Sequence, residues 1–151
     1  MSGLTNGYVE KIGKKHCKGF IGVFPCNIQP KNMKNEKNFS LIFNESKHNE
    51  DGSHFIAVCS NSNNIYYFDS LGLKCENAYI LKFLNQFDKK IIENNKQIQS
   101  YNSIFCGYHC LAFVLYMSMN KKYESFFTFF DDNNLKLNDE IVIHLLIKLL
   151  K

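Results

Sequence analysis

Two short apolar runs in the middle of the chain constrain the fold more than any other feature. Residues 54–60 and 65–69 are rich in Phe, Ile, Val and Tyr, and the Ser and Asn residues between them favour a turn. The pattern predicts two antiparallel strands joined in a hairpin. Both faces of both strands are largely apolar, so we expect a central sheet that is covered on each side.

Two further strands are predicted before this hairpin. Residues 19–24 and 40–44 are short apolar runs, the first of them ended by a proline. Residues 29–39 and 45–52 are polar and predict loops, the second of which contains His48. The first 18 residues are polar and contain three glycines, which leaves open an irregular start or a short helix.

Helical patterns follow in the second half of the chain. Residues 76–94 predict an amphipathic helix, because apolar side chains recur there at intervals of three and four. These side chains are Ile80, Phe83, Leu84, Phe87 and Ile91. Residues 107–119 are apolar nearly all round and predict a central buried helix. Another short helix is expected over 123–130, and Asn138 is expected to cap a last helix through Leu150.

Composition fits one packed domain. The chain has 151 residues, of which 45% are hydrophobic and 15% aromatic, and it contains neither an internal repeat nor a linker. That supply of apolar side chains is sufficient for one core and excludes a disordered chain. We therefore predict a single α+β domain over residues 1–151.

Charge and cysteine content bound the partners and the location. The net charge is +4, but the lysines are spread along the chain, so a solvated surface is favoured and weak association with DNA is the lesser alternative. The start of the chain has no apolar signal-peptide core, and no run approaches the roughly 20 apolar residues of a membrane span. Six cysteines without such a signal predict reduced thiols in the cytoplasm or nucleus.

A histidine and an aspartate are placed to meet on the predicted hairpin. If the turn is centred near Asn61 and Ser62, paired residue numbers sum to about 123 or 124, which brings His54 and Asp69 to the same face. An aspartate beside a histidine fixes the tautomer of the ring and stabilises the imidazolium. Taken alone, however, the pattern fits an exposed polar pair at the end of a hairpin better.

Cys106 directly precedes the strongly apolar helix pattern. A cysteine at a helix N-terminus meets the positive end of the helix dipole, which lowers the thiol pKa and favours the reactive thiolate. Gln99 lies upstream in the same segment, and its amide can donate to an oxyanion. Taken alone, Cys106 fits better as a small buried side chain.

The order of these four residues resembles the adenovirus protease (adenain) family, which includes relatives encoded by Polinton-type transposons and related DNA viruses. Three segments carry the resemblance: Gly-Ser-His-Phe-Ile-Ala at 52–57, Tyr-Phe-Asp-Ser-Leu-Gly at 67–72, and Gln-Ser-Tyr-Asn-Ser-Ile-Phe-Cys-Gly-Tyr-His-Cys at 99–110. The last matches the family pattern Gln-x-x-Asn-Ser-x-x-Cys-Gly-x-x-Cys at every defining position. The likeness spans about residues 18–120.

The resemblance implies a papain-like α+β cysteine protease fold, with a central mixed sheet, helices on both faces and the nucleophile at the start of a buried helix. It implies that Cys106 is the nucleophile, His54 its base, Asp69 the residue that orients His54, and Gln99 an oxyanion donor. The implied substrates are viral or transposon precursor proteins cleaved after Gly-Gly or Gly-x-Gly. A monomer without cofactor is expected, in the host cytoplasm or nucleus or inside virus particles, and not secreted.

The sequence departs from the family pattern at several positions. The family Trp after the catalytic histidine is Phe55 here, and an Asp of some relatives is Asn27. No cysteine occurs over residues 76–105, so covalent activation by a peptide, as in adenain, is not expected. The chain is also shorter than adenain at its C-terminus.

Three alternatives remain at this stage. A protease that removes SUMO or ubiquitin-like modifiers shares the residue order, although such enzymes usually carry Asp where Phe105 stands. A catalytically inactive binding module would keep the fold without the reaction. Metal binding by Cys106, His109 and Cys110 is disfavoured, because the spacing is not that of paired zinc knuckles.

Overall fold

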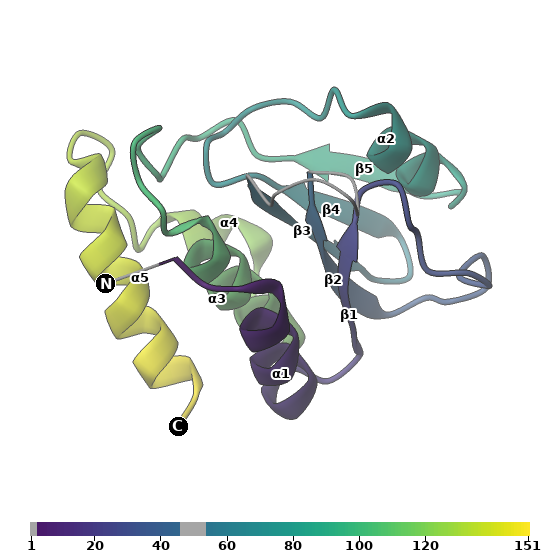
Figure 1. The fold of residues 1–151 in the computed structure, drawn as a ribbon, viewed down its shortest axis with the longest axis horizontal. Helices are drawn as coiled ribbons and strands as arrows, with labels where there is room; N and C mark the ends of the chain where they lie inside the picture. Colours follow the sequence, from purple (N-terminus) through teal and green to yellow (C-terminus); the bar gives the residue numbers. More distant parts are fainter. Residues whose placement is uncertain (1–2, 46–53) are drawn as a thin grey trace.

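The structure is a computed structural model, and it describes residues 3–45 and 54–151. Five strands form one mixed sheet in the order β1-β2-β3-β4-β5 (Figure 1). The outer pairs β1/β2 and β4/β5 are parallel, and the two inner pairs are antiparallel. The strands are β1 (Phe20–Pro25), β2 (Phe39–Asn44), β3 (Phe55–Ser60), β4 (Asn64–Phe68) and β5 (Lys90–Glu93). The loop predicted over 45–52, including His48, lies beyond Glu45 outside the described residues.

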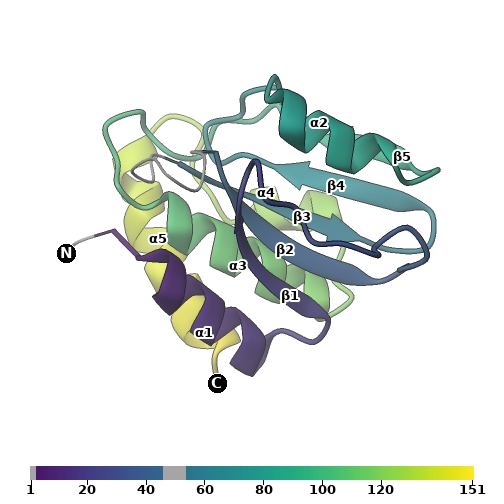
Figure 2. The same ribbon diagram turned by 45° about the vertical axis from the view of Figure 1, so that its right-hand side comes forward.

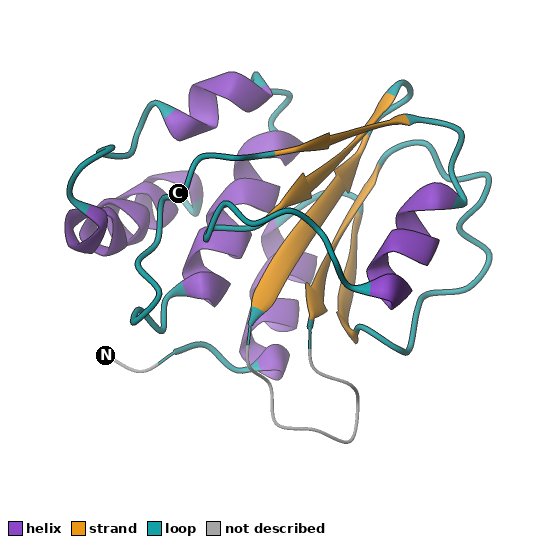
Figure 3. Cartoon of the chain, turned by 90° about the horizontal axis from the view of Figure 1, so that it is seen from above, coloured by secondary structure: helices purple, strands orange, loops and turns teal. Residues whose placement is uncertain are grey.

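Helices cover both faces of this sheet, as predicted. Helix α2 packs alone on one face, and the other helices lie on the opposite face (Figures 2 and 3). The helices are α1 (Asn6–His16), α2 (Ala78–Asn85), α3 (Cys106–Ser118), α4 (Tyr123–Phe127) and α5 (Leu135–Leu149). The predicted α+β class with a central mixed sheet is confirmed, and the first residues of the chain include a short helix.

Strand β3 separates two apolar cores. Its alternate residues Phe55, Ala57 and Cys59 face the core that contains α3, whereas Ile56 and Val58 face the core beneath α2. Successive side chains of a strand point to opposite faces, so a strand with helices on both sides must be apolar throughout. This explains why the segment shows no alternation of polar and apolar residues.

Helix α3 is the centre of the larger core. Leu111, Ala112, Phe113, Val114 and Leu115 are each at most 1% exposed. The ring of Phe113 stacks on that of Phe68 in β4, with centroids 4.4 Å apart and planes 7° from parallel. A helix buried on every side requires the apolar composition that the sequence shows here.

The predicted helix over 76–94 is too long. Helix α2 ends at Asn85, and Ile91 belongs to the edge strand β5, which pairs in parallel with β4. Ile91 is partly buried in the core beneath α2, and for that reason it matched the apolar spacing of a helix. The backbone of residues 90–93, however, forms hydrogen bonds with β4 instead of continuing the helix. A pattern of apolar side chains does not reveal such backbone pairing. Residues 94–98, which follow β5, form a loop without strand pairing.

The predicted cap of the last helix is also wrong. Helix α5 begins at Leu135, and its N-cap Asn134 accepts a hydrogen bond from the Leu137 N–H at 3.1 Å. Asn138 lies inside the helix and is fully buried. Its amide nitrogen donates to the carbonyls of Ile98 and Asp131, both at 2.9 Å, and its oxygen accepts from the Asp131 N–H at 2.7 Å. Asn138 therefore fastens the loop before Gln99 to α5.

Replacing these two asparagines distinguishes their roles. Asn138→Ala leaves several buried partners unpaired, at about 1–3 kcal/mol for each such group. Asn134→Ala removes a helix cap, at about 1 kcal/mol. Urea unfolding of the two variants is expected to show the larger loss for Asn138→Ala. An equal or reversed order would contradict the placement of Asn138 inside the helix.

Candidate active site

The four residues singled out in the sequence meet at one end of the sheet. His54, Gln99 and Cys106 line a cavity of about 660 Å³, and Asp69 lies behind His54. Residues 3–7 form one wall of this cavity, and further lining comes from Leu71, Tyr101 and Ile104. Segments that are far apart in the sequence thus enclose one cleft.

His54 and Asp69 form a hydrogen bond in spite of an error in the predicted register. Ala57 pairs with Phe68, whereas the prediction paired it with Tyr66 or Tyr67. The turn is therefore centred later, and Asp69 lies diagonally from His54 instead of opposite it. Diagonal neighbours two residues apart share one face. The Nε2 atom of His54 lies 2.8 Å from Oδ1 of Asp69.

Asp69 is held in place by backbone and side-chain contacts. Its Oδ1 also accepts the Leu71 N–H at 2.9 Å. The side chain of Asn94 closes a pair of hydrogen bonds with the Asp69 backbone, because it accepts the N–H at 2.9 Å and donates to the carbonyl at 2.7 Å. The carboxylate therefore reaches His54 from a fixed backbone. Nothing in the sequence singled out Asn94 for this role.

Cys106 is the first residue of α3, and its thiol faces the imidazole of His54. Burial alone would raise the pKa of Cys106, but hydrogen bonds from His54 and from the backbone of Phe55 and Gly107, with the charge of His54, lower it below its ordinary value. Burial likewise opposes the charge of His54, yet the hydrogen bond of Asp69 and then the contact with Cys106 raise the pKa of His54 to about 10. Both shifts favour a thiolate beside an imidazolium.

The side-chain amide of Gln99 has one defined orientation. Its Nε2 donates to the carbonyl of Ser103 at 3.0 Å, and its Oε1 accepts from the hydroxyl of Ser70. A carbonyl is only an acceptor, so the Ser103 contact identifies the nitrogen end of the amide. Within residues 3–45 and 54–151, Ser103 is the partner of this nitrogen, so its second N–H can donate to a substrate oxygen in the cleft that Gln99 lines.

Ser70 and Gly72, in the segment after Asp69, also shape the site. The Ser70 carbonyl accepts the N–H groups of Ile98 and Gln99 at 2.9 and 3.0 Å. Gly72 has a φ of +72°, and an added Cβ would lie 2.8 Å from the nitrogen of Gln97. Only glycine permits both this backbone and this approach. The segment after β4 therefore presents Asp69 and anchors Gln99 together.

Gly107, the residue after Cys106, is also constrained by its neighbours. A Cβ on Gly107 would meet Leu4 at 3.2 Å and the ring of Phe55 at 3.4 Å. Phe55, the residue after His54, is 7% exposed and packs into the core beside α3. The Phe55 ring packs against the start of α3, next to Gly107. The Phe55 backbone hydrogen-bonds to Cys106 and so stabilises its thiolate.

The other thiols have a different environment. Cys17, Cys26, Cys59, Cys75 and Cys110 are buried, and Cys106 is the partly exposed one. Within residues 3–45 and 54–151, no three His, Cys, Asp or Glu side chains are grouped so as to hold a metal ion. No helix in that same part of the chain is long and apolar enough to cross a membrane.

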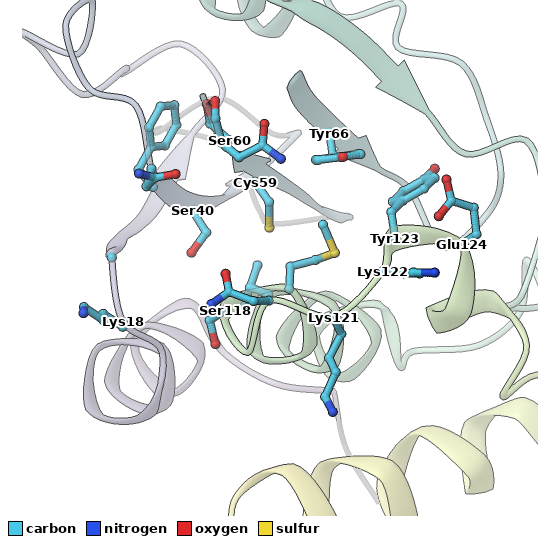
Figure 4. Close-up of a pocket in the computed structure, with 17 residues that line it drawn as sticks. Lys18, Ser40, Cys59, Ser60, Tyr66, Ser118, Lys121, Lys122, Tyr123 and Glu124 are labelled. Carbon is cyan, nitrogen blue, oxygen red and sulfur yellow. Dashed lines mark hydrogen bonds between the residues drawn. The ribbon is translucent and has the colours of Figure 1, made fainter. Parts of the chain in front are cut away.

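A second cavity of about 710 Å³ lies at the opposite end of the central strands and contains none of the four site residues. Figure 4 shows it between Ser40, Cys59 and Ser60 of the strands and Ser118 at the end of α3. Lys121 and Lys122 also line it. The predicted site residues His54, Gln99 and Cys106 line the first cavity and not this one.

Comparison with solved structures shows which fold this is. The ASFV pS273R protease aligns over 95% of this chain and 68% of its own, with a TM-score of 0.63 and 17% identity. The SUMO protease Ulp1, with its catalytic cysteine oxidised to a sulfinic acid, aligns over 99% and 80%, with a TM-score of 0.55 and 17% identity. The chain has the fold of these two proteases. No family model and no curated protein matches the sequence.

The reactivity of Cys106 can be tested directly in this protease fold. Iodoacetamide reacts with thiolates, and the other cysteines are buried, so labelling of folded protein reports on Cys106. We expect a pH midpoint below the ordinary value of 9.0, and a higher midpoint in His54→Ala, which lacks the stabilising imidazolium. A midpoint of 9.0 or above in the unaltered protein, or no labelling, would favour the inactive binding module.

Asp69 is expected to set the alkaline limit of activity. Because Asp69 raises the pKa of His54, Asp69→Asn lowers that pKa, and the fall in kcat/KM at high pH begins about one pH unit or more earlier. The pH profile of peptide cleavage measures this shift. Asp88→Asn, at an exposed position outside the cleft, serves as the control and leaves the profile unchanged.

Proposed function

We propose that this protein is a cysteine endopeptidase. The observation that carries the proposal is the row formed by the Cys106 thiol, the His54 imidazole and the Asp69 carboxylate, in a cleft that Gln99 also lines. The row has the order nucleophile, base and orienting acid that acyl transfer requires. The two proteases that share the fold support the same reaction class.

The reaction follows from these positions. The Cys106 thiolate attacks the scissile carbonyl carbon, and the carbonyl oxygen becomes an oxyanion near the free N–H of Gln99 and the backbone N–H of Cys106. The His54 imidazolium then gives its proton to the leaving amine, and a thioester remains on Cys106. Water attacks the thioester as His54 accepts its proton, and the carboxylic acid product leaves with the thiolate and the imidazolium restored.

We further propose that the substrates are precursor proteins of virus or transposon particles, cut after Gly-Gly or Gly-x-Gly. The family resemblance supports this choice, as does the likeness to a protease of ASFV. The cleft is lined by residues 3–7 and by Tyr101 and Ile104. We propose that a substrate with small glycine residues next to the scissile bond fits beside these side chains. A monomer that acts in the host cytoplasm or nucleus, or in the particle, belongs to the same proposal. Weak association with DNA stays a prediction from the net charge.

Removal of a SUMO-like modifier is the second candidate function. The likeness to Ulp1, named as a SUMO protease, favours it. Proteases that remove such modifiers also cut after Gly-Gly. The residue before the nucleophile is Phe105, where deconjugating enzymes usually carry Asp. That difference and the match of Asn102 and Ser103 to the adenain pattern place this candidate second.

A cleavage assay separates the two candidates. Peptides with Gly-Gly-x and Gly-x-Gly-x sites are incubated with the protein beside a SUMO precursor, and the products are identified by mass spectrometry. We expect cleavage of the peptides after glycine and none by Cys106→Ala. Cleavage of the SUMO precursor alone would replace the first candidate with the second.

Gln99→Ala tests the oxyanion donor. Loss of one such donor lowers kcat by roughly 10²–10³, and KM changes little, because the interaction forms in the tetrahedral intermediate. Gln86→Ala, at an exposed position outside the cleft, is the matched control and keeps the unaltered rate. An unchanged kcat in Gln99→Ala would remove Gln99 from the mechanism.

A further inference from the structure

A chain of hydrogen bonds connects the last helix with the oxyanion donor. Oδ2 of Asp139 in α5 accepts the Ser103 hydroxyl at 2.8 Å. That hydroxyl oxygen accepts the N–H of Phe105 at 3.1 Å, and the Ser103 carbonyl accepts Nε2 of Gln99 at 3.0 Å. Asp139 is thus two contacts away from the amide that faces the cleft.

The other carboxylate oxygen of Asp139 is tied to the nucleophile helix. Oδ1 lies 3.2 Å from Nε2 of His109, which is fully buried in α3 and follows Cys106 by one turn. Helices α3 and α5 lie side by side in Figures 1 and 2. Asp139 therefore joins three parts: the helix that begins at the nucleophile, the loop that carries Gln99, and α5.

We propose that Asp139 is a positioning residue for the oxyanion donor, acting through Ser103 to hold the Gln99 amide against the cleft. The inference rests on the proposed protease function and adds to it a residue that never touches the substrate. Without the Asp139 contact, the Ser103 hydroxyl loses its acceptor, and the loop turn that presents the Ser103 carbonyl loses its support. The Gln99 amide can then rotate away from the oxyanion.

A carboxylate is required at position 139 because both neighbours donate to it. The Ser103 hydroxyl receives the Phe105 N–H and so must give its own proton to Asp139. Burial lowers the pKa of His109, so the ring is neutral and carries one proton, which Nε2 gives to Asp139. The Nδ1 atom of His109 has no hydrogen-bond partner among the described residues.

An asparagine at this position cannot satisfy both donors. If its oxygen faces Ser103, its NH₂ group faces His109, and the ring proton must move to the unpartnered, buried Nδ1. If its NH₂ group faces Ser103, the hydroxyl meets two donors and no acceptor. The first arrangement leaves the buried Nδ1–H of His109 unpaired, and the second leaves the half-buried Ser103 hydroxyl without an acceptor. Either one disturbs the loop without changing the size of the side chain.

Asp139→Asn is therefore the first variant to measure. Because a small displacement of a catalytic group has a large effect, kcat is expected to fall by roughly 10- to 100-fold with little change in KM. Glu140→Gln is the matched control, since it makes the same change in charge at the next, exposed position of α5. The rate of Cys106 alkylation, which depends on His54, is expected to stay unchanged in both variants.

A double-mutant cycle shows whether Asp139 acts through Gln99. In the Gln99→Ala background the donor is already absent, so adding Asp139→Asn is expected to change kcat by less than about threefold. Ser103→Ala is expected to reproduce the loss of kcat caused by Asp139→Asn. A full additional loss in the Gln99→Ala background would overturn the inference, and so would an unchanged kcat in Asp139→Asn.

A readout that needs no turnover keeps this inference separate from the proposed function. The side-chain NH₂ signals of Gln99 in ¹⁵N-labelled protein, assigned by their loss in Gln99→Glu, are expected to shift in Asp139→Asn and Ser103→Ala but not in Glu140→Gln. If the unaltered protein cleaves no substrate and these shifts occur, the protease proposal fails and the positioning contact stands. If cleavage occurs and the Gln99 signals do not move, the positioning role fails.

Discussion

The packing of α3 against β3 is the constraint on which the rest of this structure depends. His54 precedes β3 and Cys106 begins α3, so the contact between these two apolar elements sets the distance between the His54 imidazole and the Cys106 thiol. Ala57, with its small side chain, faces the helix, and Gly107 allows Phe55 and Leu4 to pack closely at its first turn. A well-packed interior resists changes of even one methylene, which gives the site a rigid support.

Burial and charge act against one another in this site. Removal from water disfavours both the thiolate of Cys106 and the imidazolium of His54. The two charges stabilise each other, and Asp69 and backbone N–H groups add to that stabilisation. The reactive pair therefore depends on a set of donors and acceptors that the fold holds in place. Asp69 itself needs Asn94 and the Leu71 N–H to present its carboxylate.

Two loops carry these polar groups, and they are fastened to each other. The segment after β4 supplies Asp69, and its Ser70 binds both the backbone and the side chain of Gln99. The loop from Ile98 to Cys106 is fastened in turn to α5 by Asn138, which binds Ile98, and by Asp139, which binds Ser103. The part of α5 near the cleft therefore supports the loop that carries Gln99 as well as the core.

The sequence alone predicted strands β1 to β4, the buried helix and the four residues that meet at the end of the sheet, but it predicted a helix where β5 lies. The strands could be recognised because burial on both faces demands apolar residues throughout, and His54 met Asp69 despite the wrong register because side chains of a strand repeat every two residues. Only the tertiary structure decided the end of α2 and the roles of Ser70, Asn94, Asn138 and Asp139. Edge-strand pairing and hydrogen bonds between segments 25 to 40 residues apart leave no periodic trace in the chain, since they depend on where the packed core brings those segments together.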